Sequence, residues 1–327
     1  MKTDKPLLAL LLSLTAGPIL EGYTMLMKYL SLTNLTAFET FSFLSSNGEP
    51  HFTMGIIGLF TVVNWYFLLA YYSANIWGTA FFPIKTMFLA MTGESIFFLT
   101  FGVLGKNEVV AQTVIGNYIH ASAAALAGLW VGFLYQKYLF KNWMGKSLKT
   151  DKPLLAMAIG WAGWPIAEGL TLLAKYFGLA KLTTMESSSL MWLLTNPSQV
   201  LGILSELGLG AWLGLIIYYS TNLWSSDYLP IKAALILVTC RSLIVQIFGV
   251  LGRNPLLIQD SVGETLVHAL GAILGGLAIG YLMQKFLFKS AITTKGGEVN
   301  ICSSYNLQLF YHCNNQSNYR SYQPMEV

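Results

Sequence analysis

Long apolar stretches separated by short polar segments make up most of the chain as far as its polar end. A helix that crosses a bilayer needs about 20 mainly apolar residues, and each stretch reaches that length. The stretches fall into two sets of four with matching spacing. The predicted spans are 6–30, 53–77, 82–104 and 114–139 in the first set, and 153–178, 199–224, 229–251 and 262–287 in the second. The pattern therefore predicts an all-α polytopic membrane protein with eight transmembrane helices.

The two sets are copies of one unit. The segment Lys2–Ala9 recurs letter for letter as Lys149–Ala156, an offset of 147 residues. The same offset relates many later positions, among them Pro18/Pro165, Glu21/Glu168, Lys28/Lys175, Glu39/Glu186, Trp77/Trp224 and Lys85/Lys232. One inserted residue then changes the offset to 148. The sequence thus predicts a tandem duplication of a four-helix unit.

An even number of spans in each copy has a topological consequence. Four crossings return the chain to its starting side, so both copies insert in the same orientation, unlike the inverted repeats of many transporters. We expect a first repeat over 1–145, a second over 146–289, and a polar cytoplasmic tail over 290–327. The tail is rich in Ser, Asn, Tyr and Gln and has no counterpart in the repeat, which predicts disorder.

Composition and charge agree with a membrane protein. Apolar residues make up 54% of the chain and charged residues 10%, with a mean hydropathy of +0.56; soluble domains carry roughly 25% charged residues. If the N-terminus is inside, thirteen of the 19 Lys and Arg residues lie on the inner side and five on the outer side, with Arg241 inside a span. This asymmetry predicts a multi-pass protein of the cell membrane with both termini in the cytoplasm. The net charge of +4 then reflects topology, and no nucleic-acid surface is expected.

The first span follows a basic start and resembles a cleavable signal peptide. Its copy at 149–156 can only be a linker entering a span, so we expect the first segment to be retained. The cysteines are Cys240, Cys302 and Cys313, which form no disulfide framework. Together with His312 in the tail they are too few and too widely spaced for a structural zinc site. No cofactor or metal is therefore expected.

The candidate chemistry consists of polar side chains inside apolar helices, where burial requires a partner. Glu21 and Glu168 each follow a proline by three residues, and His120 and His268 lie at comparable depth in the fourth helix of each repeat. We predict that each glutamate approaches the histidine of its own repeat. The pair is either a relay for protons or cations, or a buried hydrogen bond that fixes helix packing.

Two further spans carry charges. Glu94 and Arg241 occupy equivalent positions, 147 residues apart, near the middle of the third helix of each repeat. Opposite charges at equivalent sites predict a contact between the repeats, if these helices line a pseudo-twofold axis. The alternative is that each charge is satisfied within its own half, for example Arg241 by Glu206 in the sixth span. Leu59 stands where Glu206 would be expected in the first repeat, so the two halves are not chemically identical.

Other positions indicate packing or orientation. Gly128-x-x-x-Gly132, with the pairs Gly271/Gly275 and Gly276/Gly280, predicts close approach of helix backbones. Lys28 and Lys175 are expected to extend toward the outer headgroups.

The unit as a whole resembles the small YagU-like four-helix integral membrane proteins. The likeness lies in the order of features: a Gly/Pro-bearing first helix, a proline-led third helix beginning at Pro83-Ile84-Lys85, a glycine-containing exit at Gly102 and Gly105, and a fourth helix with early His120 and later glycines. The resemblance covers most of 1–289 as two copies. It implies the membrane fold but no reaction, so no catalytic residue follows from it.

Three classes of function fit these observations. The first is a transporter or channel-like protein that uses intramembrane Glu and His groups. The second is a non-catalytic membrane scaffold, sensor or stress-related protein. The third, a membrane-embedded enzyme, is disfavoured because the sequence contains no nucleophile–base pair, P-loop or clustered metal ligands. The expected partner is the lipid bilayer, with self-association into a homo-oligomer as an option; the substrate is not specified.

The topology can be tested with reporter fusions placed after residues 40, 146 and 295. We expect the reporter at 40 to lie outside and the reporters at 146 and 295 to lie inside, because the Lys and Arg residues cluster around the latter two positions. An outward-facing reporter at 146 would overturn the parallel arrangement of the repeats.

Overall fold

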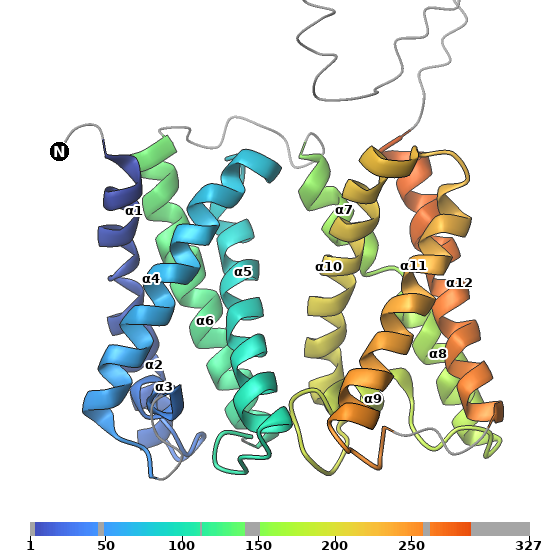
Figure 1. The fold of residues 1–327 in the computed structure, drawn as a ribbon, viewed down its shortest axis with the longest axis horizontal. Helices are drawn as coiled ribbons and strands as arrows, with labels where there is room; N and C mark the ends of the chain where they lie inside the picture. Colours follow the sequence, from blue (N-terminus) through green and yellow to red (C-terminus); the bar gives the residue numbers. More distant parts are fainter. Residues whose placement is uncertain (1–3, 45–48, 112, 141–150, 258–261, 289–327) are drawn as a thin grey trace, which may run out of the picture.

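The computed structural model describes residues 4–44, 49–111, 113–140, 151–257 and 262–288 (Figure 1). Within these ranges every regular element is a helix. Seven helical segments of 23 to 27 residues have the length and apolar composition needed to cross a membrane. The chain is therefore a multi-pass integral membrane protein in contact with the lipid bilayer. The predicted tail with Cys302, His312 and Cys313, and the connection over 141–150, lie outside the described residues.

The same order of elements occurs in both halves of the chain. The first half contains α1 (Lys5–Ser13), α2 (Ala16–Tyr29), α3 (Ala37–Phe41), the short 3-10 helix η1 (Ser42–Leu44), α4 (Phe52–Trp77), α5 (Phe82–Phe97), η2 (Phe98–Leu104), α6 (Val114–Leu134) and η3 (Tyr135–Phe140). The second contains α7 (Lys152–Gly160), α8 (Trp164–Tyr176), α9 (Thr184–Ser189), α10 (Gln199–Trp224), α11 (Leu229–Ile244), η5 (Val245–Leu251) and α12 (Val262–Phe286). The segments η2, η3 and η5 are π-helical.

The ends of these helices follow from local sequence. The side chains of Asp4 and Asp151 accept the backbone N–H three residues later, at 3.0 and 3.1 Å, and so cap α1 and α7. Pro83 and Pro230 stand in the first turn of α5 and α11. A proline lacks the N–H that the first helical turn leaves unpaired, so it starts a helix without cost.

The fifth predicted span, 153–178, is not one continuous helix. It consists of α7 and α8, separated by a turn over 161–163 in which the N–H of Ala162 donates to the carbonyl of Ile159 at 2.9 Å. Pro165 lies in the first turn of α8 and cannot donate back to the preceding turn. Gly163 has helical dihedrals, and its lack of a side chain makes room for Ile279, whose Cδ1 would lie 2.6 Å from a Cβ there. Of the eight predicted spans, seven are thus present as membrane-length helical segments within the described residues.

The segments that follow the first predicted span of each repeat contain structure of their own. After α2 the chain forms α3, and after α8 it forms α9, each five or six residues long. Both short helices pack against the start of the following long helix. A Cβ built on Gly55 of α4 would overlap the backbone of Phe38, and one built on Gly202 of α10 would overlap that of Met185. Glycine at these two positions therefore brings the short helices against the bundle.

The predicted close approach of helices at glycine pairs is confirmed. In α6, a Cβ on Gly128 would lie 2.6 Å from Cα of Met87, and one on Gly132 would lie 2.6 Å from Cα of Pro83. In α12, Gly276 and Gly280 approach α11 in the same way. Small residues at these points let α5 pack on α6 and α11 on α12.

The two halves lie side by side, with α5 of the first half next to α7 and α10 of the second (Figure 1). At this boundary the ring of Phe88 lies 5.4 Å from that of Trp212, measured between centroids. The Nε1–H of Trp212 donates to Oγ1 of Thr92 at 2.9 Å. In contrast, α11 lies on the far side of α10 from the first half. The third helices of the two repeats therefore do not meet at a common axis.

The glycine contacts can be tested by substitution. We expect Gly128→Ala to destabilise the protein by about 1–3 kcal/mol, because the methyl group has to displace the backbone of α5. The matched control is Gly22→Ala in α2, where a Cβ would meet nothing within 4 Å. That variant should be neutral or stabilising by up to about 1 kcal/mol, the helix propensity difference. Thermal unfolding in detergent measures both; equal losses would contradict the packing argument.

Candidate functional site

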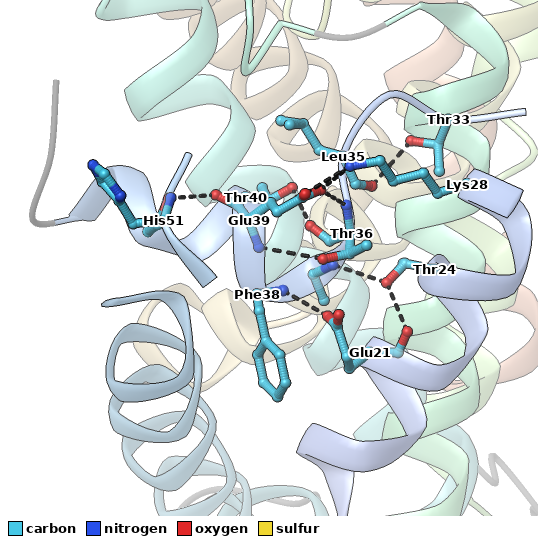
Figure 2. Close-up of polar contacts among 12 residues, drawn as sticks. Glu21, Thr24, Lys28, Thr33, Leu35, Thr36, Phe38, Glu39, Thr40 and His51 are labelled. Atoms are coloured by element: carbon cyan, nitrogen blue, oxygen red, sulfur yellow. Dashed lines mark hydrogen bonds and ion pairs between the residues drawn. The ribbon is translucent and has the colours of Figure 1, made fainter. Parts of the chain in front are cut away.

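Glu21 holds the short helix α3 in place (Figure 2). Its Oε2 accepts the N–H of Phe38 at 2.7 Å, and Oγ1 of Thr24 accepts the N–H of Ala37 at 2.8 Å. Both donors belong to the first turn of α3, whose N–H groups have no partner within the helix. The second half repeats the arrangement, since Oε2 of Glu168 accepts the N–H of Met185 at 2.8 Å. These glutamates therefore dock a short helix against the bundle.

A second set of contacts closes the same motif on its outer side. Thr36 and Glu39 form a capping box, in which each side chain accepts the other residue's N–H. Nζ of Lys28 then bonds the Glu39 carboxylate at 2.6 Å (Figure 2). The second half has the equivalent capping box and an equivalent ion pair between Lys175 and Glu186, also at 2.6 Å. The two lysines hold the short helices through ion pairs, and their predicted extension toward lipid headgroups stays a prediction.

This motif was not predicted, although the sequence contains its signal. The pattern Thr-x-x-Glu occurs at 36–39 and again at 183–186, and it is a signature of a helix start. The repeat relates Glu39 to Glu186, but the helix start that each of them marks was not among the predictions.

Within the first half, His120 lies between two acceptors. Its Nδ1 is 3.3 Å from Oε1 of Glu94, and its Nε2 is 3.2 Å from the carbonyl oxygen of Leu35. All three groups are buried in the bundle, and Glu21 is close enough to His120 to interact electrostatically. The hydrogen bonds of Glu21, however, go to α3. The predicted Glu21–His120 pair is therefore a pair of neighbours, and the partner that His120 contacts directly is Glu94.

Within the second half, the equivalent histidine faces an arginine. Nη2 of Arg241 lies 3.1 Å from Nδ1 of His268 and donates to Oγ of Ser187 at 2.9 Å. His268 also hydrogen-bonds the backbone of Leu182, which is the counterpart of Leu35. Glu206 bonds the hydroxyl of Ser188 and interacts electrostatically with Arg241. The second half thus contains a polar cluster, which we define as Ser188, Glu206, Arg241 and His268.

The predicted contact between Glu94 and Arg241 is wrong. Each of these side chains is satisfied within its own half, by His120 and by His268 with Ser187. The reason is the arrangement of the halves, in which α5 faces α10 rather than α11. The alternative of separate satisfaction is confirmed, although the direct hydrogen bonds of Arg241 go to Ser187 and His268 and its interaction with Glu206 is electrostatic.

The two histidines face partners of different kinds. Arginine carries only donors, so the nitrogen of His268 that faces Arg241 has to be unprotonated, and the other nitrogen carries the ring proton. His120 instead has an acceptor at each nitrogen. Both of its contacts are hydrogen bonds only when the Glu94–His120 pair holds one additional proton, either on the ring or on the carboxyl group.

A cavity of about 70 Å³ adjoins the cluster in the second half. Its walls combine the four cluster residues with backbone at the break between α7 and α8, where Gly160 and Gly163 line it. A water molecule needs roughly 10–15 Å³ of such volume. The space therefore accommodates a few waters or a small polar ligand next to charged side chains.

The equivalent position in the first half is nearly filled. The cavity there is about 30 Å³ and is lined by Glu94 among apolar side chains. Tyr66 and Phe41 occupy the space that Leu213 and Ser188 leave open in the second half, at positions offset by 147. Smaller side chains and Glu206 thus convert one apolar site into a larger polar one.

Two buried polar atoms of the second half have no hydrogen-bond partner among the described residues. They are Nε of Arg241, a residue that lines the cavity, and Oε1 of Glu168. Glu168 interacts electrostatically with Glu206. An unpaired buried donor or acceptor costs about 1–3 kcal/mol. One free donor and one free acceptor near a polar cavity fit a small species that can both accept and donate, such as water.

Comparisons with known proteins add no family to this description. No protein-family model matches the chain, and no curated protein or solved structure matches it significantly.

Double-mutant cycles can separate the pairs in this site. We expect Glu94→Gln and His120→Gln to couple by about 0.5–3 kcal/mol, the range for residues in direct contact. Glu94→Gln and Arg241→Gln should instead be additive within about 0.5 kcal/mol, as for separated sites. Thermal or denaturant unfolding in detergent measures each term. Strong coupling between Glu94 and Arg241 would contradict this assignment and support a direct contact between the repeats.

Proposed function

We propose that the chain is an eight-pass protein of the cell membrane, built from two parallel four-helix repeats with both termini in the cytoplasm. In this topology α7 and α8 together form the fifth crossing along the chain, which brings the total to eight. The start of α1, the start of α7 and the end of α12 lie at the same end of the bundle (Figure 1), which supports four crossings in each half. The excess of Lys and Arg at that end supports its assignment to the cytoplasmic side. The likeness to YagU-like proteins stays a prediction.

Within this frame the protein is a transport-type protein in which the second half moves protons. The observation that carries the proposal is the cavity beside Glu206, Arg241 and His268, with the unpaired Nε of Arg241 next to it. Charged residues in the membrane interior are costly, and they mark ion or proton pathways in many membrane proteins. Glu206 is absent from the first half, where Leu59 occupies its position.

The chemistry follows from the partners of each group. Glu206 is the proton-exchanging carboxyl group, because it is bonded by a hydroxyl and faces the cavity. Arg241 is a fixed cation that stabilises the ionised carboxylate, and it holds His268 as a neutral acceptor. Glu168, with one free carboxylate oxygen near Glu206, is a second station for the proton.

The broken helix supports the same function. Gly160 and Gly163 place the ends of α7 and α8 in the cavity wall. Discontinuous helices at membrane depth are found where backbone lines a cavity or a substrate site. The first half contains a break between α1 and α2, but Leu20 and aromatic side chains line the corresponding cavity there.

Proton flux into liposomes tests this function. The purified full-length protein is reconstituted with an internal pH-sensitive dye, and a potassium gradient with valinomycin supplies the driving force. We expect flux above that of protein-free liposomes. Glu206→Gln should lower it by about tenfold or more, equivalent to about 1.4 kcal/mol of barrier, since the exchangeable proton is lost.

A matched pair of variants serves as control. Glu168→Gln should reduce flux, whereas Glu21→Gln, at the equivalent position of the first half, should leave it unchanged. In both variants the side-chain oxygen of glutamine can still accept the N–H of the short helix, so the two variants should have equal thermal stability. Absence of flux in the unsubstituted protein, or full flux in Glu206→Gln, would contradict the proposal and favour a scaffold or sensor, the second class that the sequence allows.

A further inference from the structure

The boundary between the two halves uses two different surfaces. One is the α5 face, which we define by Lys85, Phe88 and Thr92. The other is the α10 face, defined by Asp151, Trp212 and Tyr219. Because the surfaces differ, the contact is head-to-tail rather than twofold. A head-to-tail contact between two copies leaves one copy of each surface unused, at the two ends of the molecule.

The unused surfaces are formed by the residues that the 147-residue offset of the repeat relates to those at the boundary. The α11 face consists of Lys232, Leu235 and Thr239, the counterparts of the α5 face. The α4 face consists of Asp4, Trp65 and Tyr72, the counterparts of the α10 face. In Figure 1 the helix α11 lies away from the boundary between the halves, and α4 reaches the boundary only with its C-terminal end, where the carbonyl of Ile76 accepts the hydrogen bond of Tyr219.

These surfaces are open in the structure. The exposed fraction is 66% for Trp65, 49% for Tyr72 and 63% for Leu235. Thr239 and Asp4 are exposed as well, whereas Lys232 is half-buried. Most side chains that pack at the boundary thus have an exposed relative at one end of the molecule.

The charges are complementary as well. At the boundary, Nζ of Lys85 bonds Oδ2 of Asp151 at 2.6 Å, with the lysine side chain fully buried. Lys232 bonds the carbonyl of Trp224 at 2.5 Å and reaches no carboxylate within the described residues. Asp4 is exposed, and its carboxylate accepts the N–H of Leu7 but forms no ion pair within the described residues. One cation and one anion at opposite ends therefore lack the ion pair that their copies form.

Lipid alone is a poor cover for the α4 face. Trp65 stands near the middle of α4 and points outward, and its indole N–H has no partner among the described residues. Tryptophan usually lies at the membrane interfaces, where its N–H is solvated. The counterpart Trp212 donates this N–H to Thr92 across the boundary. The equivalent acceptor for Trp65 is the hydroxyl of Thr239 on the α11 face.

We propose that the α11 face of one chain binds the α4 face of a second copy of the same chain, reproducing the internal boundary between molecules. Asp4 then pairs with Lys232, and Trp65 donates to Thr239. The same rotation applied at each contact yields a closed ring or an open row, depending on its angle. Each chain thus contributes two repeats to this ring or row.

Cross-linking between chains tests the proposal. The full-length protein, with Cys240, Cys302 and Cys313 replaced by serine, receives Trp65→Cys in one tagged chain and Thr239→Cys in a co-expressed chain with another tag. A short thiol-reactive cross-linker in native membranes should give a covalent dimer carrying both tags. A chain with both substitutions should give dimers and higher species.

Two controls make the result decisive. Trp65→Cys paired with Leu274→Cys, on an exposed position near the middle of α12, should give no dimer. Thr92→Cys with Trp212→Cys in one chain, with a protease site inserted into 141–150, should keep the cleaved halves joined and so shows that the cross-linker spans this contact. Absence of a Trp65–Thr239 dimer while this internal pair reacts would overturn the proposal, as would equal yields with Leu274→Cys.

The ion pair gives an independent check. Lys232→Glu in one chain should lower the cross-linked yield severalfold, and Asp4→Lys in the other chain should recover it. Loss of yield without recovery by the exchanged charges would count against the predicted register. Proton flux by the same preparations is a separate readout, so failure of the assembly and failure of the transport function remain distinguishable.

Discussion

A bundle in a bilayer has to satisfy its buried polar groups from within, because the surrounding hydrocarbon offers neither donors nor acceptors. The rest of this structure follows from that constraint. Glu21 and Glu168 sit at a cost inside apolar helices, and each accepts an N–H from the first turn of a short helix. The segments between the long helices fold inward for the same reason. At Arg241, whose Nε has no partner among the described residues, the structure has a cavity.

The sequence predicted the features that depend on composition and failed where relative orientation decides. Hydropathy located the spans because the bilayer imposes length and apolarity, and the glycine pairs predicted where helices touch. The break before Pro165 was not predicted because hydropathy alone reads the segment as one apolar run, although the proline itself marks a possible helix start. The partners of Glu94 and Arg241 were mispredicted because a duplication fixes the parallel sense of two units but not which faces meet. Periodicity cannot distinguish a twofold contact from a head-to-tail one.

The two halves place different charges at equivalent positions. In the first, the carboxyl group of Glu94 faces His120. In the second, Arg241 brings a permanent positive charge that faces His268, and Glu206 and Glu264 interact with it electrostatically. The differences belong together, because a buried arginine requires acceptors and negative charge nearby, and Glu206 stands where the first half has Leu59. The half that carries the arginine also has the larger cavity at this position.

The ion pair between Lys85 and Asp151 joins two events that are usually separate. Asp151 caps the first turn of α7 and also pairs with a lysine 66 residues earlier in the chain. The second half therefore begins its first helix in contact with α5 of the first half. One carboxylate oxygen starts a helix and the other joins the repeats, so loss of this side chain disturbs the start of α7 and the junction between the halves at once.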